Sequence, residues 1–252
     1  MDGLQIIECR ELTKVYGTQV AVDHLNLTIN PGEIFGFLGP NGAGKTTTLL
    51  MLIGLSEPTS GSATVCGFNP TRDPLKVKRV VGYLPENVGF YDDLDAMQNM
   101  LFVSRLNDIP DEIARTKIAE LLEVVELASE KNKKVGNFSR GMRQRLGIAE
   151  VLVKEPQVVF LDEPTLGLDP DGSARMLDLI SSLSREKNIT VFFSSHMLDQ
   201  VQKISHRVGI MLKGKLVASG KIDDLAKEKF GVDKEIHTLE GIYMKYFKEG
   251  AK

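Results

Sequence analysis

The sequence predicts an α/β fold with a mainly parallel sheet. Short runs rich in apolar and β-branched residues alternate with amphipathic stretches at helical spacing. Strands that are buried on both faces and separated by helices are typical of such a sheet. The predicted strands span residues 34–38, 80–84, 158–161, 190–194 and 208–212. Smaller runs predict added antiparallel strands near the N-terminus, at residues 5–9, 25–29 and 63–66.

Composition limits the possible partners. The 252 residues are 42% hydrophobic and 26% charged, which is typical of a folded globular domain. Lys and Arg total 31 against 34 Asp and Glu, so no basic excess favours nucleic acid or anionic lipid. Cys9 and Cys66 stand apart and fit neither a disulfide framework nor a zinc site, which favours a reduced cytoplasmic setting.

No segment resembles a targeting or membrane-spanning sequence. The start of the chain matches neither a signal peptide nor an anchor. The apolar run at residues 49–55 falls far short of the roughly 20 residues that cross a bilayer. If the protein works at a membrane, we therefore expect another chain to supply the span.

The predicted organisation is a single domain, residues 1–252, with an inserted helical part. Residues 94–127 carry apolar positions at helical spacing and contain no convincing strand. We expect three parts within the domain. These are a catalytic core with its antiparallel β subdomain at 1–90 and 155–220, an α-helical subdomain at 91–154, and a C-terminal helical extension at 221–252. The extension holds amphipathic pieces at 225–230 and 239–247.

A glycine-rich loop carries the strongest functional signal. Residues 39–46 read Gly-Pro-Asn-Gly-Ala-Gly-Lys-Thr, which has the spacing of a P-loop. The loop follows the apolar strand 34–38 directly and opens a helical stretch at 47–55. Backbone N–H groups in such a loop turn towards phosphate oxygens, and the helix N-terminus adds a positive dipole. The fold expected is therefore that of a P-loop nucleotide hydrolase.

Individual roles follow from the chemistry of the loop. Lys45 is expected to place its charge at the β and γ phosphates, and the Thr46 hydroxyl to bind Mg²⁺. The guanine-reading pattern Asn-Lys-x-Asp is absent, because residues 132–135 read Asn-Lys-Lys-Val. ATP is thus the expected nucleotide. The residues expected to contact it here are Asn41, Gly42, Ala43, Gly44, Lys45, Thr46 and Thr47.

Two acids end a predicted buried strand. Asp162 and Glu163 follow the apolar residues 158–161, and ligands of parallel sheets bind where the strands end. Asp162 would hold Mg²⁺, and Glu163 would orient and polarise the attacking water. His196 follows the next strand and could hydrogen-bond the γ phosphate as a third catalytic group beside Lys45 and Glu163. Taken alone, a histidine in this position is more often structural than catalytic.

The segment 138–145 resembles the signature sequence of ATP-binding cassette (ABC) proteins. It reads Phe-Ser-Arg-Gly-Met-Arg-Gln-Arg. Nearly the whole chain resembles the nucleotide-binding subunits of ABC transporters, because the family's motifs occur in the family's order. They are Tyr16, the P-loop, Glu86, the signature, the two acids, Asp169 and His196.

The resemblance implies further roles. Tyr16 would stack on adenine, with simple packing as the alternative. Ser139 and Gly141 would contact the γ phosphate held by a second subunit in a head-to-tail dimer, and Asp169 would connect the two sites. The dimer would be ATP-induced and formed by two copies of this chain or by a pair of related subunits. The family also implies an integral-membrane permease partner, which would hold this subunit on the inner face of the cell membrane.

Departures from the common family pattern point to one branch. Glu86 stands where the wider family has glutamine, and its carboxylate can still reach Mg²⁺. The signature carries Phe138, Arg140 and Met142 in place of leucine, glycine and glutamine. These variations, with the tail at 239–243, resemble the branch that serves exporter-type permeases, so the resemblance implies ATP-driven export of a cargo chosen by the permease.

Two other functions stay open at this point. One is a soluble ABC ATPase in translation or DNA repair, which would ordinarily show two cassettes or a long coiled coil between P-loop and signature. The other is a nucleotide-dependent switch with little turnover. The presence of Lys45, Asp162, Glu163 and His196 argues against the switch.

Overall fold

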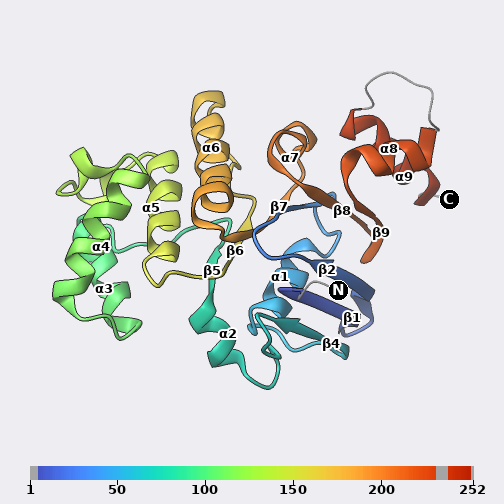
Figure 1. Cartoon of the computed structure of the whole chain (residues 1–252), viewed down its shortest axis with the longest axis horizontal. Coiled ribbons are helices and arrows are strands. Elements are labelled where there is room, and N and C mark those ends of the chain that lie inside the picture. The colour runs from blue at the N-terminus through green and yellow to red at the C-terminus, as the bar shows by residue number, and fades with distance from the viewer. Residues whose placement is uncertain (1–4, 231–237, 251–252) are drawn as a thin grey trace.

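The computed structural model describes residues 5–230 and 238–250. A parallel sheet lies at the centre of the chain, as Figure 1 shows, and an antiparallel sheet packs beside it. Within the described residues the central sheet has six strands in the order β5-β6-β7-β3-β8-β9. Residues 1–4 of the predicted N-terminal stretch and 231–237 of the predicted tail lie outside the described residues. The α/β fold class is confirmed.

The strands of the central sheet are short and mostly buried. Their bounds are β3 (Ile34–Leu38), β5 (Val81–Leu84), β6 (Val158–Asp162), β7 (Thr190–Ser195), β8 (Arg207–Leu212) and β9 (Lys215–Gly220). All neighbouring pairs are parallel except β8 and β9, which are antiparallel. The five predicted strands are thus confirmed, with one adjustment, since Val80 ends helix α2 (Pro74–Val80) and β5 begins at Val81.

Both faces of this sheet are covered, and alternate residues of one strand serve two cores. On β3, Ile34 and Leu38 join an apolar cluster that also contains residues of helices later in the chain than the P-loop. Phe35 and Phe37 point the other way and join a cluster with α1 (Lys45–Leu52) and the antiparallel sheet. Side chains of successive strand residues alternate between faces, so a strand with two cores is apolar throughout.

The antiparallel sheet has the order β2-β1-β4. Its strands are β1 (Ile7–Tyr16), β2 (Gln19–Ile29) and β4 (Ser60–Val65). The predicted antiparallel strands are confirmed, but β1 and β2 are longer than the apolar runs at 5–9 and 25–29. Register shifts between Cys9 and Val15 break the alternation of buried and exposed residues. A β-bulge adds a residue to one strand and so hides the two-residue period.

Strand β9 was not predicted. It is an edge strand with the sequence Lys-Leu-Val-Ala-Ser-Gly, and none of its residues is fully buried. The turn before it has positive φ at both central residues, 49° at Lys213 and 84° at Gly214. Two such residues form the turn that suits a tight hairpin. The dipeptide Lys-Gly was therefore the available signal for a strand returning along β8.

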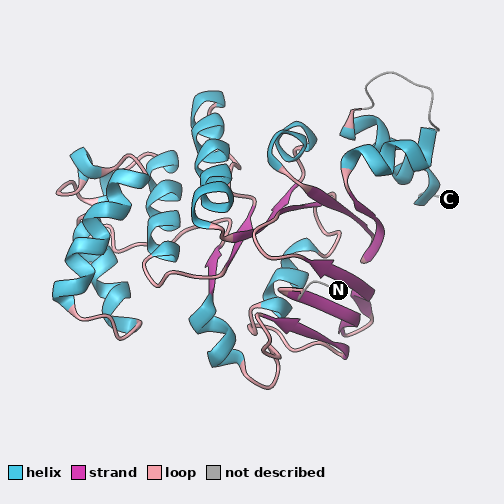
Figure 2. Ribbon diagram, in the orientation of Figure 1, coloured by secondary structure: helices cyan, strands magenta, loops and turns pink. Residues whose placement is uncertain are grey.

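Helices surround the central sheet, with one group set apart. Helices α3 (Ala96–Leu106), α4 (Asp111–Val124) and α5 (Arg140–Leu152) stand together at one end in Figures 1 and 2. Two short 3₁₀ turns, Ala128–Glu130 and Val135–Asn137, lie between α4 and α5. Asp95 caps α3 by accepting from Gln98 N at 2.8 Å, so the acidic stretch at 92–95 is a helix start. The predicted helical character of 94–127 is confirmed.

The remaining helices come after β6 in the chain. They are α6 (Pro170–Lys187), α7 (Leu198–Ile204), α8 (Ile222–Phe230) and α9 (Leu239–Gly250). Helix α9 packs on the core through the buried Leu239 and Ile242, and the Gln202 side chain of α7 accepts from Leu239 N at 2.8 Å. Across residues 5–230 and 238–250, every helix is too short or too polar to span a bilayer.

Glu150 on α5 gives the fold a testable pH dependence. Burial raises the pKa of its carboxyl to about 7, above the ordinary 4.5. The folded state therefore binds this proton more tightly than the unfolded chain does. The contribution of Glu150 to the free energy of unfolding is fully present below pH 4.5 and is lost as the pH rises through about 7. We expect Glu150→Gln to remove that loss and to stabilise the protein at pH 8 by on the order of 2 kcal/mol, roughly 4–8 °C in melting temperature.

The measurement is thermal unfolding of both proteins at pH 5 and pH 8. The difference in melting temperature between the variant and the wild type should be small at pH 5 and larger at pH 8. Other carboxyl groups titrate equally in both proteins, so the difference isolates Glu150. Parallel pH profiles for the two proteins would contradict this expectation.

Candidate active site

The P-loop lies where β3 ends and α1 begins, beside the ends of β7 and β8. Gly44, the residue before α1, has a φ of 104°, and a Cβ there would lie 2.3 Å from the Ala21 carbonyl oxygen. Gly42 has a φ of 77° and faces open space, with nothing within 4 Å of a built Cβ. Gly44 is therefore required by close packing, whereas Gly42 leaves room for a ligand to approach the backbone.

A cavity of about 380 Å³ opens over this loop. Its size is that of a small-ligand site. Most predicted nucleotide contacts line it, namely Tyr16, Asn41, Gly42, Gly44, Lys45, Thr46, Thr47, Glu86 and Glu163. Of the P-loop residues expected to contact the nucleotide, Ala43 alone does not line this cavity, because it is buried and its N–H donates to the Pro40 carbonyl at 3.1 Å.

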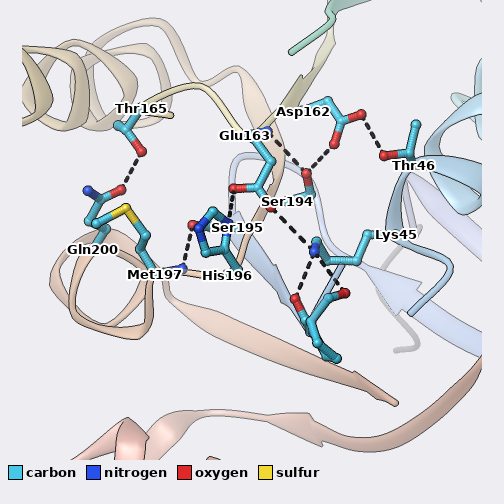
Figure 3. Close-up of polar contacts among 12 residues, drawn as sticks. Lys45, Thr46, Asp162, Glu163, Thr165, Ser194, Ser195, His196, Met197 and Gln200 are labelled. Atoms are coloured by element: carbon cyan, nitrogen blue, oxygen red, sulfur yellow. Dashed lines mark hydrogen bonds and ion pairs between the residues drawn. The ribbon is translucent and has the colours of Figure 1, made fainter. Parts of the chain in front are cut away.

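Lys45 and Glu163 form a buried ion pair at the base of the cavity. Lys45 Nζ lies 3.3 Å from Glu163 Oε1, as Figure 3 shows. It also donates to the Gly39 carbonyl at 2.7 Å. Both side chains are less than a tenth exposed. Glu163 Oε1 accepts no hydrogen bond among the described residues. A buried carboxylate with a free acceptor is suited to bind and polarise a water.

His196 completes this group from the neighbouring strand. Its Nδ1 lies 2.9 Å from Glu163 Oε2, so the two carboxylate oxygens face a lysine and an imidazole. The Glu163 backbone has a φ of 50°, which is uncommon for a residue with a side chain. Its N–H donates to Ser194 at 3.2 Å, which helps to hold this conformation. Such backbone strain clusters at functional sites.

Thr46 and Asp162 offer the oxygen ligands that Mg²⁺ prefers. The Thr46 hydroxyl donates to Asp162 Oδ2 at 2.8 Å, and the Ser194 hydroxyl donates to Asp162 Oδ1 at 2.5 Å. Burial, then the charges of Asp162 and Glu86, raise the pKa of the nearby Tyr83 to about 12. A hydroxyl and a carboxylate within hydrogen-bond distance of each other fit a bound divalent cation. Among the residues described, no group of three or more His, Cys, Asp or Glu side chains forms a cation site.

Tyr16 stands at the rim of the cavity. The ring is 49% exposed, so it does not belong to the core. Lys14 Nζ lies 4.8 Å from the ring centroid, and the hydroxyl is 3.4 Å from Ser56 Oγ. A ring oriented by two neighbours, yet half open at a cavity, favours the predicted stacking on a planar base over the packing alternative.

The remaining predicted residues gather elsewhere. Ser139, Gly141 and Asp169 line a second cavity of about 350 Å³, between the start of α5 and the loop before α6. Ser139 caps α5 by accepting from Met142 N at 3.3 Å, and Asp169 caps α6 by accepting from Gly172 N at 3.1 Å. The structure thus brings the P-loop, the acids and His196 together and places the signature residues in another site of the same chain.

The structure adds residues that the sequence analysis missed. Ser194 holds Asp162, and Gln144 Nε2 donates to the Glu86 carbonyl at 3.1 Å, which connects the signature helix to the Glu86 loop. Arg140 lies against the loop before Asp169, since a Cβ on Gly167 would meet its guanidinium at 2.8 Å. Ser194 lies near the end of the apolar strand β7, as Asp162 lies at the end of β6, and that position was the available signal.

Comparison with known proteins identifies the family. Residues 22–166 match the ABC transporter family. The bacitracin transport ATP-binding protein BcrA of Bacillus licheniformis is 47% identical over 222 residues, which cover 88% of this chain and 72% of that protein.

Two solved structures agree with this match. The structure of an ATP-binding subunit of an ABC transporter superposes with a TM-score of 0.85 at 25% identity, over 96% of this chain and 99% of that one. The dimeric structure of MJ0796, a bacterial ABC transporter cassette, gives 0.77 at 25% identity over 86% and 98%. This chain therefore belongs to the ABC transporter family, as an ATP-binding subunit that hydrolyses ATP and acts with a membrane permease.

Proposed function

We propose that this subunit binds ATP with Mg²⁺, closes on a second ATP-binding subunit and so powers export of a substrate through its permease. The observation that carries the proposal is that the motif residues of this chain line two separate cavities. The P-loop, Asp162 and Glu163 line or adjoin one cavity, whereas Ser139 and Gly141 line the other. A second copy of the chain, or a related one, would bring a signature site to each P-loop.

Each residue has a distinct task in this proposal. The P-loop N–H groups and Lys45 would hold the phosphates, and Tyr16 the adenine. Thr46, Asp162 and Glu86 would hold Mg²⁺, which neutralises charge on the phosphates when bound. Glu163 would orient the attacking water, and His196 would hold the Glu163 carboxylate and reach the γ phosphate. Asp169 would connect the paired sites.

Closure would depend on ATP. A ligand shifts a conformational equilibrium only by its differential affinity for the two states. ATP would supply that difference, because its γ phosphate contacts Ser139 and Gly141 in the closed pair alone. Hydrolysis would remove those contacts and reopen the pair.

The proposed direction of transport, export, comes from the departures at Glu86 and in the signature segment 138–145, which resemble the exporter-type branch. BcrA is named for bacitracin transport, and it is 47% identical to this chain. We propose export of a substrate selected by the permease, with this subunit cytoplasmic and peripheral on the inner face of the membrane. In the same proposal residues 1–252 act as one ATPase domain, and the helical part at 91–154 and the loop at Glu86 pass the motion to the permease.

The test compares ATP hydrolysis with and without membranes that contain the permease. The purified chain, Mg²⁺ and ATP are assayed alone and on those membranes, with membranes lacking the permease as control. We expect hydrolysis to rise several-fold only with the permease. Equal turnover in all three samples would favour a soluble ATPase, and no turnover in any would favour a nucleotide-dependent switch.

A further inference from the structure

Two hydrogen bonds connect the loop after Glu163 to the segment after His196. The first joins His196 Nδ1 to Glu163 Oε2 at 2.9 Å. In the second, the Thr165 hydroxyl donates to Gln200 Oε1. Figure 3 shows the two contacts side by side, bridging the same pair of segments. Thr165 follows Glu163 by two residues, and Gln200, which lies on α7, follows His196 by four.

The Thr165–Gln200 contact is buried. The two residues are 3% and 7% exposed, so water cannot readily replace either partner. The loop itself turns tightly, with Leu166 N donating to the Glu163 carbonyl at 3.1 Å and Leu168 N to the Thr165 carbonyl at 3.2 Å. Among the described residues, the Thr165–Gln200 hydrogen bond is a buried side-chain contact between this loop and α7.

That loop needs an external support at its first residue. Glu163 has a φ of 50°, a conformation that persists only where its surroundings hold it. The same loop ends at Asp169, the cap of α6, in the second cavity. A shift of the loop would thus move the water-orienting carboxylate in one cavity and a lining residue of the other.

We propose that Thr165 and Gln200 are positioning residues for ATP hydrolysis. Their hydrogen bond fixes the loop from Glu163 to Asp169 against α7, so that Glu163 keeps its two oxygens directed at Lys45 and His196. Neither side chain lines the nucleotide cavity, so the pair acts on the rate of hydrolysis and leaves ATP binding intact. The inference rests on the proposed role of Glu163.

The test uses Thr165→Val, Gln200→Leu and the double variant. Each single variant leaves a buried polar atom without a partner, whereas the double variant replaces both partners with apolar groups and should regain stability. We expect each single variant to lower kcat about ten- to a hundredfold with KM for ATP unchanged, because a small misplacement of a reacting group is costly. The double variant should melt closer to wild type yet keep the low kcat.

Gln202→Leu is the matched control. Gln202 lies on the same helix as Gln200. Its side chain accepts a hydrogen bond from Leu239 N of α9 and takes no part in the Thr165 contact. It should alter stability and leave kcat unchanged. Recovery of kcat in the double variant, wild-type kcat in both single variants, or an equal loss of kcat in Gln202→Leu would each overturn the proposal.

Hydrogen–deuterium exchange gives a readout that does not depend on turnover. In the ATP-free protein, amides of residues 163–169 should exchange faster in Thr165→Val and in Gln200→Leu than in wild type or Gln202→Leu. Unchanged exchange would overturn the positioning role even if the wild type hydrolyses ATP. A wild type without ATPase activity but with this exchange pattern would instead contradict the proposed function and keep the structural assignment.

Discussion

Glu163→Gln should lower the rate of ATP hydrolysis by about 10²- to 10⁴-fold, the usual contribution of a general base. Glutamine keeps the size of the side chain and its contact with His196, but it loses the negative charge that polarises water. Glu163 Oε1 is buried and lies 3.3 Å from Lys45 Nζ, so the affected atom is at the phosphate end of the cavity. ATP binding should persist, because the P-loop is untouched.

Persistent binding without hydrolysis should trap the closed state. With ATP and Mg²⁺, the Glu163→Gln protein is expected to form a stable dimer, measured by size-exclusion chromatography with light scattering. The wild type should return to monomer as ATP is consumed.

Glu155→Gln is the control for backbone effects. Glu155 has a similar left-handed backbone, with a φ of 56°, but its carboxylate pairs with Lys117 at 2.6 Å, away from the nucleotide cavity. It should hydrolyse ATP as the wild type does. Hydrolysis by Glu163→Gln at a rate near that of the control would rule out Glu163 as the base.

The fold was largely predictable because its central strands are buried on both faces. Such strands are continuous apolar runs, and β3 matches its predicted bounds, Ile34 to Leu38. The pattern failed where burial is partial or the pairing irregular. Edge strand β9 has no fully buried residue, and β1 carries bulges, so neither shows a two-residue period.

The candidate site was predictable where chemistry fixes residue type and spacing. Gly42, Gly44 and Lys45 are constrained by backbone geometry and charge, and the structure places them around one cavity. Contacts between distant segments carry no such local pattern. The bonds from Ser194 to Asp162 and from Thr165 to Gln200 join residues more than thirty positions apart, and only the packing of β6, β7 and α7 brings them together.

Lys45→Met should weaken ATP binding roughly 30- to several-thousand-fold, since loss of one partner of a buried charge pair costs about 2–5 kcal/mol. Methionine keeps the length of the apolar stem but donates nothing, so the γ-phosphate end of the cavity loses its cation and Glu163 loses its ion pair. Titration calorimetry with ATP and Mg²⁺ measures the effect.

The control is Lys154→Met, because Lys154 also donates to a backbone carbonyl, that of Lys78 at 2.6 Å, outside the nucleotide cavity. That variant should bind ATP normally even if it melts earlier. Equal affinities for ATP in Lys45→Met and Lys154→Met would show that the phosphates do not bind at Lys45. The nucleotide site would then not lie at this loop.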